Sequence, residues 1–279
     1  MNRSSSPKGI MQTSLVLTFH GIRTSLRSPA SAGEFFADRY TVDEQILRHA
    51  VLQAAPKGCC TVFGLIGGMT GCGVVFSFDD GLISDYEVAY GVLSSAGVKA
   101  TFFVTAGNTG LPGYCNKSQL RELAGAGMEI ASHGMHHVYL TTMSREQVLR
   151  EIGDSKRMLE DLVGKEVVSY APVGGHYRRW MYEAAREAGY RAFATMIPGL
   201  TTVGEETFLV RRNHIQDDHT QDYVSRILAC DRGILARNRI RYRALETARR
   251  LLGMRGYDLL KGVVLKRVER VAHFRNASR

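Results

Sequence analysis

Between residues 74 and 212, short apolar stretches alternate with longer stretches in which apolar residues recur at helical spacing. The apolar stretches predict strands at 74–78, 100–105, 128–132, 167–170, 192–196 and 208–212. The stretches between them predict helices at 86–95, 117–125, 145–163 and 178–189. Consecutive parallel strands need a crossover connection, so this alternation predicts βαβ units and a parallel sheet, either open or closed into a barrel. In such folds the chemistry lies at the C-terminal ends of the strands.

The chain before residue 74 is less regular. Residues 15–19 predict an opening strand that ends at His20, and residues 42–55 have helical spacing. Residues 1–14 predict a polar arm and residues 23–40 a loop. Residues 58–73 hold six glycines but lack the Gly-Lys-Ser/Thr ending of a phosphate-binding loop, so we expect a flexible connection there.

The net charge of +9 is concentrated at the C-terminal end of the chain. Residues 232–279 hold 14 basic and 3 acidic residues, whereas residues 1–231 are nearly neutral. Apolar residues such as Ile240, Ala244, Ala248 and Leu251 recur there at helical spacing, so we expect a basic amphipathic helix. The chain is thus predicted to consist of a polar arm (1–14), a barrel domain (15–231, with its core motifs in 73–200) and a basic helical extension (232–279).

Three kinds of contact fit such a helix. It can pack on the barrel with its charges in water, or lie on an anionic membrane surface. It can also bind nucleic acid, although the segment carries no recognised nucleic-acid motif. We therefore expect packing on the barrel or peripheral membrane contact, and rank nucleic acid last.

The cysteines give little support for a disulfide framework or a structural zinc site, because they are odd in number and form no C-x-x-C pair. They are Cys59, Cys60, Cys72, Cys115 and Cys230. The first 13 residues lack the apolar region of a secretory signal, and no apolar run reaches the ~20 residues of a membrane span. We therefore expect reduced thiols and a cytoplasmic location, with membrane contact confined to the surface of the inner face.

Two adjacent carboxylates end the predicted strand 74–78, in the sequence Ser77-Phe78-Asp79-Asp80-Gly81. Where the chain turns at a strand end, both side chains can reach one site. Two close carboxylates resist joint ionisation unless a cation lies beside them or one keeps a proton. A metal ligand next to a general base would use both groups, and the alternative is a turn in which an aspartate caps a helix.

Three histidines follow the predicted strand 128–132, at His133, His136 and His137. Imidazole is a common zinc ligand, and spacings of three or four residues bring two rings to one ion. This spacing leaves both His136 and His137 open as the partner of His133. Two histidines and one carboxylate leave coordination positions free, as in catalytic sites where a metal activates water. The two clusters together predict metal-assisted hydrolysis.

These clusters resemble the motifs of the polysaccharide deacetylases, the NodB-homology group of carbohydrate esterase family 4. Residues 77–81 resemble the T/S-F-D-D-G motif of that family, and residues 133–137 resemble its H-S/T-x-x-H motif. Tyr170-Ala171-Pro172-Val173-Gly174 stands where its R-x-P-x-G motif is expected. The resemblance covers residues 73–200, with a weaker match at 15–21, and it implies a distorted (β/α) barrel with about seven strands.

The resemblance also implies a role for each matching residue. Asp80, His133 and His137 would hold a divalent metal, usually Zn²⁺. Asp79 would be the general base for the attacking water. The segment Pro172-Val173-Gly174 would bind the substrate, with the backbone N–H of Val173 stabilising the oxyanion.

The sequence departs from the family pattern at three places. Gly134 replaces the Ser or Thr that follows the first histidine, and Tyr170 replaces the Arg that pairs with the base. The arginines that could substitute are Arg178, Arg211 and Arg212. The L-x-H motif that supplies the general acid is not found, and the candidates are His20, His176, His214 and His219. His20 has the best position because it ends a predicted strand.

The implied function is removal of N-acetyl groups from a sugar, either a polysaccharide or a lipid-linked or nucleotide-linked precursor. One alternative is hydrolysis of another amide, such as a formamido sugar or a small ureide. Another is a carbohydrate-binding or scaffold protein that keeps the barrel without turnover, which the missing arginine and the unidentified general acid motivate.

Overall fold

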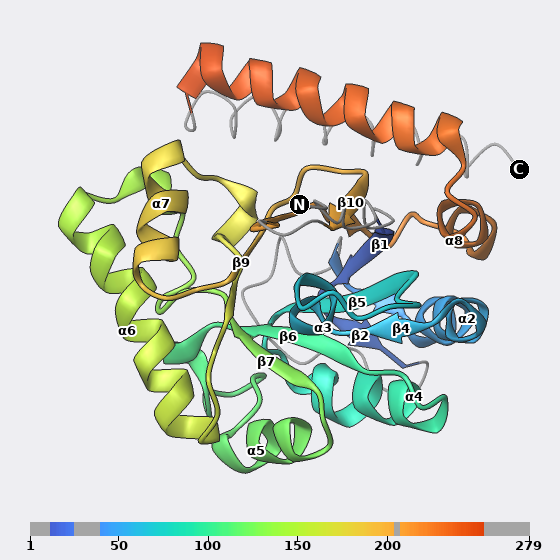
Figure 1. Cartoon of the computed structure of the whole chain (residues 1–279), viewed down its shortest axis with the longest axis horizontal. Coiled ribbons are helices and arrows are strands. Elements are labelled where there is room, and N and C mark those ends of the chain that lie inside the picture. The colour runs from blue at the N-terminus through green and yellow to red at the C-terminus, as the bar shows by residue number, and fades with distance from the viewer. Residues whose placement is uncertain (1–11, 25–39, 204–206, 254–279) are drawn as a thin grey trace, which may run out of the picture. The chain divides into compact units, whose positions relative to one another are not determined.

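A nearly closed, barrel-like sheet forms the centre of the structure, a computed structural model that describes residues 12–24, 40–203 and 207–253 (Figure 1). Its main path contains seven successive parallel strands: β1 (Gln12–Phe19), β5 (Val74–Asp80), β6 (Ala100–Val104), β7 (Glu129–Ser132), β8 (Ser169–Tyr170), β9 (Ala192–Ala194) and β11 (Leu209–Val210). An eighth strand, β10 (Leu200–Val203), pairs antiparallel with β1. Two short strands lie off this path, with β12 (Asn213–His214) beside β1 and β4 (Cys59–Cys60) beside β5. The predicted distorted barrel is confirmed.

Helices cover the outside of the sheet (Figure 1). They are α2 (Glu44–Ala54), α4 (Tyr90–Ser95), α5 (Lys117–Gly125), α6 (Arg145–Val163), α7 (Arg179–Glu187) and α8 (Gln221–Leu228). The predicted helices 117–125 and 145–163 have the observed bounds, because each has a complete local start signal. Asn116 and Ser144 cap them, and the glutamine three residues later bonds back to the cap in both. The predicted helix 86–95 begins instead with a π-helical turn, η2 (Asp85–Ala89).

The barrel interior is packed with small and apolar side chains, among them Val16, Phe103, Ala131, Ala171 and Val210. Side chains alternate between the two faces of a strand, so neighbours of interior residues point out toward the helices. Phe102 follows this rule and packs against Phe78, outside the barrel. Asp79 is in register with the interior residue Phe103, so its side chain points into the barrel.

The glycine-rich segment 58–73 is ordered, and the expectation of a flexible connection is wrong. It forms β4 and a short helix, α3 (Val62–Ile66), whose Val62 and Leu65 are buried in the interior cluster. The backbone N–H of Phe63 donates to Glu129, at the start of β7. The helix α3 therefore packs at the N-terminal end of the barrel, opposite the end where chemistry is expected.

A disulfide joins Cys60 to Cys72, which contradicts the expectation of reduced thiols. The two cysteines are 12 residues apart, and both are buried in the interior cluster. No local motif marks this pairing in the sequence, because the folding of α3 onto the barrel brings the two thiols together. In the described structure, Cys59, Cys115 and Cys230 are unpaired.

Replacing both Cys60 and Cys72 with serine is expected to lower the free energy of unfolding by about 3 kcal/mol, the loop-closure value for a bridge of this span. Thermal unfolding of the variant beside the oxidised protein measures the loss. Cys230→Ser, which removes an unpaired thiol, is the matched control. Equal melting temperatures for the oxidised protein and the double variant would contradict the expected contribution.

The chain divides into two units, Met1–Asp231 and Arg232–Arg279. Within the second unit, residues 232–253 are helical. Among the described residues, no helix is both long and apolar enough to cross a membrane. The predictions of a polar arm at 1–14, a loop at 23–40 and a helix beyond residue 253 lie largely outside the described residues.

Candidate active site

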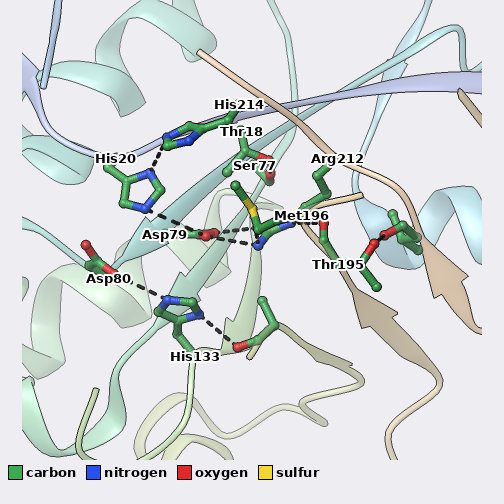
Figure 2. Close-up of polar contacts among 12 residues, drawn as sticks. Thr18, His20, Ser77, Asp79, Asp80, His133, Thr195, Met196, Arg212 and His214 are labelled. Atoms are coloured by element: carbon green, nitrogen blue, oxygen red, sulfur yellow. Dashed lines mark hydrogen bonds and ion pairs between the residues drawn. The ribbon is translucent and has the colours of Figure 1, made fainter. Parts of the chain in front are cut away.

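The predicted site residues lie at the C-terminal ends of neighbouring strands. His20 follows β1, Asp79 and Asp80 end β5, and His133 follows β7. The strands pair in the order β1, β5, β6, β7 and β8, so residues far apart in the sequence come together at one end of the barrel (Figure 2). The turn η5 (Val173–Gly175) follows β8, the neighbour of β7.

Asp80, His133 and His137 form the one cluster in the described residues that could hold a metal ion. Their ligand atoms all lie within 4.8 Å of one another. Asp80 Oδ1 is 2.9 Å from His137 Nε2 and 3.4 Å from His133 Nε2. Asp80 and His137 have positive φ values of 83° and 53°, a conformation that is uncommon for residues with a side chain and that concentrates at functional sites. His136 faces away from this cluster, toward Glu151.

The protonation state of His133 fits a metal ligand. Its Nδ1 lies 2.8 Å from the carbonyl oxygen of Ala171, which can only accept a hydrogen bond, so Nδ1 carries the proton. Burial lowers the pKa of His133 to about 4, so the ring is neutral and Nε2 presents a lone pair to Asp80. Two acceptors that face each other repel unless a cation lies between them. The donor set therefore suits a divalent metal.

Burial raises the pKa of the Asp80 carboxyl, but the facing His20, His137 and His133 outweigh burial and keep this pKa below its usual range. Burial also lowers the pKa of His137, and its hydrogen bond with Asp80 reverses this so that the net shift is upward. Asp80 is therefore ionised at neutral pH and carries the negative charge that a divalent cation needs.

Asp79 forms a bidentate ion pair with Arg212, which lies between β11 and β12. Arg212 Nη1 is 2.5 Å from Asp79 Oδ1, and Nη2 is 3.0 Å from Oδ2. The exposed fractions are only 2% for Asp79 and 1% for Arg212. Arg212 is fixed by a hydrogen bond from Nε to the carbonyl oxygen of Thr195 and by contact with the Phe103 ring. Burial raises the pKa of Asp79, but the Arg212 charge and the nearby histidines hold it below its usual range.

The arginine missing from the third motif is thus replaced from another part of the chain. Tyr170 cannot pair with Asp79, because it points out of the barrel, where its ring packs against Tyr190 and Phe193. Of the three arginines considered from the sequence, Arg178 and Arg211 are exposed and Arg212 is buried against Asp79.

His20 is the general-acid candidate that the fold brings closest to the carboxylates. Its Nε2 lies 4.0 Å from Asp79 Oδ2, and its Nδ1 lies 3.1 Å from His214 Nε2. Tyr40 stacks on both imidazole rings. Burial and the neighbouring His20 hold the pKa of His214 well below its usual value, so His214 is neutral and can orient His20. The other two candidates lie elsewhere, with His176 packed on Tyr139 and His219 stacked on Tyr223.

A buried glutamate that we did not single out in the sequence, Glu151, fixes the loop between His133 and His137. Glu151 Oε1 accepts hydrogen bonds of 2.6 Å from the backbone N–H groups of Met135 and His136. Glu151 Oε2 lies 2.9 Å from His136 Nδ1. A Cβ atom at Gly134, which has a φ of 86°, would lie 3.1 Å from Glu151 Oε1. The glycine that departs from the family motif therefore makes room for this carboxylate.

Glu151→Leu is expected to weaken metal binding about 10- to 100-fold, because it releases the loop that carries His137. Glu151→Gln keeps an oxygen for the two backbone N–H groups and is expected to bind metal nearly as tightly as the wild type. Titration with Zn²⁺ measures both affinities, with Glu146→Leu on the exposed face of α6 as control. Equal affinity for all three variants would show that Glu151 does not position the ligand.

Comparison with known proteins finds a family model that matches part of this chain. Residues 68–193 match the family described as polysaccharide deacetylase. The chain is 31% identical over 141 residues to YxkH of Bacillus subtilis, whose name assigns it provisionally to the polysaccharide deacetylases, covering 50% of each chain. It is 32% identical over 119 residues to the peptidoglycan N-acetylglucosamine deacetylase of Bacillus cereus, covering 42% of this chain and 54% of the relative. The chain spans about half the length of the curated relatives it matches.

Solved structures share the fold. The deacetylase PplD of Streptococcus pyogenes, solved in complex with acetate, superimposes with a TM-score of 0.66 at 21% identity and covers 77% of this chain and 97% of its own. BC0361, a polysaccharide deacetylase from Bacillus cereus, gives a TM-score of 0.67 at 20% identity and covers 78% of this chain and 69% of its own. Both likenesses concern the architecture of the barrel.

Proposed function

We propose that this chain is a hydrolase of the polysaccharide deacetylase family that removes N-acetyl groups from an N-acetylated sugar. The observation that carries this proposal is the juxtaposition of the Asp80, His133 and His137 cluster with the buried, ion-paired carboxylate of Asp79. Metal ligands beside a fixed base are one arrangement that can hydrolyse an unactivated amide.

A divalent cation, with Zn²⁺ as the first expectation, would bind through Asp80 Oδ1 and the Nε2 atoms of His133 and His137. When bound, it would supply Lewis-acid chemistry that acidifies water and polarises the amide carbonyl. Three protein ligands leave coordination positions open to water and substrate, as in catalytic zinc sites.

The chain's own residues supply the proton transfers. Asp79, ionised because of Arg212, accepts a proton from the water whose oxygen forms the new bond to the carbonyl carbon. The N–H of Val173 donates to the carbonyl oxygen as negative charge develops there. His20, oriented by His214, donates a proton to the amide nitrogen as the C–N bond breaks. The products are acetate and the free amine of the sugar.

The Arg212 pair weakens the case for a non-catalytic scaffold, since the absence of an arginine partner for Asp79 was one of the two reasons for that alternative. A different amide, such as a formamido sugar or a ureide, would use the same machinery. The predicted cytoplasmic location depended on the absence of a recognisable secretory signal and on unpaired thiols, and the Cys60–Cys72 disulfide favours an oxidising compartment instead. Peripheral contact with a membrane, also expected from the basic helix, is compatible with either location.

The test is metal-dependent release of acetate. Metal-depleted protein would be reconstituted with Zn²⁺ and incubated with N-acetylglucosamine oligomers and with their N-formyl analogues. We expect one equivalent of acetate for each free amine formed, and no release without metal. Release of formate alone would identify the other amide class, and metal binding without any acyl release would refute the enzymatic proposal.

The adjacent histidines offer a matched pair of variants. His137→Gln removes a proposed ligand and is expected to weaken metal binding more than about 100-fold. His136→Gln changes a neighbouring ring that faces Glu151 and is expected to retain the metal. The opposite pattern would assign the ligand to His136, the alternative that the spacing left open.

A further inference from the structure

The side chains of the helix at residues 232–253 differ in exposure around the helix axis. Ile234 is buried, with an exposed fraction of 3%, and Tyr242 and Leu245 on the same side are partly covered. On the other side Ile240 and Leu251 are 69% and 80% exposed. At 100° per residue, Ala236, Ile240, Ala244 and Leu251 form one narrow line of exposed residues. We call this line the apolar stripe.

Arginines border the apolar stripe on both sides. Arg237 and Arg241 lie on one side of it, and Arg239, Arg243 and Arg250 on the other, all of them exposed. The helix contains seven arginines and one glutamate, Glu246, which gives it a net charge of +6. Glu246 pairs with Arg249 and Arg250 at the C-terminal end. The arginines in the middle of the helix therefore have no acidic partner on the helix itself, and their charges are exposed to solvent.

We propose that this face is a docking surface for an anionic lipid bilayer, on which the helix lies parallel to the membrane plane. A narrow apolar line flanked by arginines matches the boundary between acyl chains and head groups. The aliphatic parts of the arginines can lie along the apolar region while their guanidinium groups reach the lipid phosphates. This proposal goes beyond the deacetylase activity, because it concerns where the enzyme works.

Two other occupants fit the face less well. A nucleic acid would neutralise the arginines but would leave Ile240 and Leu251 against phosphates and water, without apolar burial. A second copy of the same helix would cover the apolar stripe but would oppose two faces of equal positive charge. A bilayer with anionic lipids satisfies both the apolar stripe and the charge.

Sedimentation of the full-length protein with vesicles tests the proposal. Vesicles of phosphatidylcholine with 30% phosphatidylglycerol are compared with vesicles of pure phosphatidylcholine. We expect binding to the anionic vesicles only. The double variant Ile240→Ser/Leu251→Ser is expected to reduce the partition coefficient about tenfold, from the apolar burial lost. Arg239→Gln/Arg243→Gln is expected to reduce it about 25-fold, because each arginine near the surface contributes about fivefold.

Matched controls distinguish docking through this helix from attraction of the vesicles by the net positive charge of the whole protein. Arg150→Gln/Arg157→Gln removes two exposed charges from α6 and is expected to leave vesicle binding unchanged. Failure to bind anionic vesicles would overturn the proposal. So would binding that is insensitive to Ile240→Ser/Leu251→Ser, since the apolar stripe would then play no part. Tighter binding to a DNA or RNA duplex than to the anionic vesicles, equally insensitive to that double variant, would assign the face to nucleic acid.

Discussion

Asp79→Asn is expected to lower the rate of N-acetyl hydrolysis by roughly 10³-fold while the protein keeps its metal. The asparagine side chain has nearly the shape of aspartate and can still accept a hydrogen bond from Arg212, but its amide cannot take a proton from water. Asp79 is not a member of the cluster formed by Asp80 and the two histidines, so metal affinity should change little. Acetate release measured at equal metal content checks this.

Asp80→Asn is the matched comparison, because it changes the adjacent residue in the same chemical way. It is expected to lose both metal and activity, since the carboxylate supplies the negative charge of the ligand cluster. If Asp79→Asn also lost the metal, the division of roles between the two aspartates would be wrong. If it retained more than a tenth of the activity, another group would be the base.

Arg212→Met is expected to lower the free energy of unfolding by about 4 kcal/mol, because it leaves the Asp79 carboxylate buried without its partner. Urea denaturation measures this loss. Arg211→Met, at the exposed neighbouring position, removes the same charge without touching Asp79 and should cost little. Equal stability of the two variants would mean that the buried ion pair does not stabilise the fold.

The same variant should change the pH dependence of activity. In the native protein Arg212 holds the pKa of Asp79 below its usual range, so the base stays ionised until the medium is acidic. Without Arg212, burial dominates and raises this pKa. The acidic limb of the kcat/KM profile is therefore expected to move to higher pH in Arg212→Met and to remain in place in Arg211→Met. An unmoved limb in Arg212→Met would contradict the role of Arg212 as the group that sets the ionisation of the base.

The sequence predicted the features that depend on local patterns. The alternation of apolar and helical stretches was sufficient for the barrel, and the bounds of α5 and α6 followed from their caps. The motif residues could be placed because each lies directly at or after the end of a strand. The ligand cluster includes His137 and not His136, a distinction that spacing alone could not make, because it depends on the turn of the loop and the positive φ of His137.

Features that depend on long-range contacts could not be predicted in the same way. Arg212 is 133 residues from Asp79, and only the closing of the barrel distinguishes it from Arg178 and Arg211. Glu151 did leave a signal that we did not use. It is a charged residue on the apolar face of α6, between Val148 and Ile152, and such a residue is buried only when it has partners.

The position of Arg212 has a consequence for the order in which the enzyme matures. The three proposed ligands lie between residues 80 and 137, whereas the partner of the base lies near the end of the barrel domain. During synthesis, the ligand-bearing half of the sheet leaves the ribosome well before Arg212 does. A chain that ends before Arg212 can thus contain every proposed ligand while it lacks the charge that holds the pKa of Asp79 below its usual range. On the proposed mechanism, the ionised state of the base therefore depends on the last part of the barrel domain, which is made after the ligands.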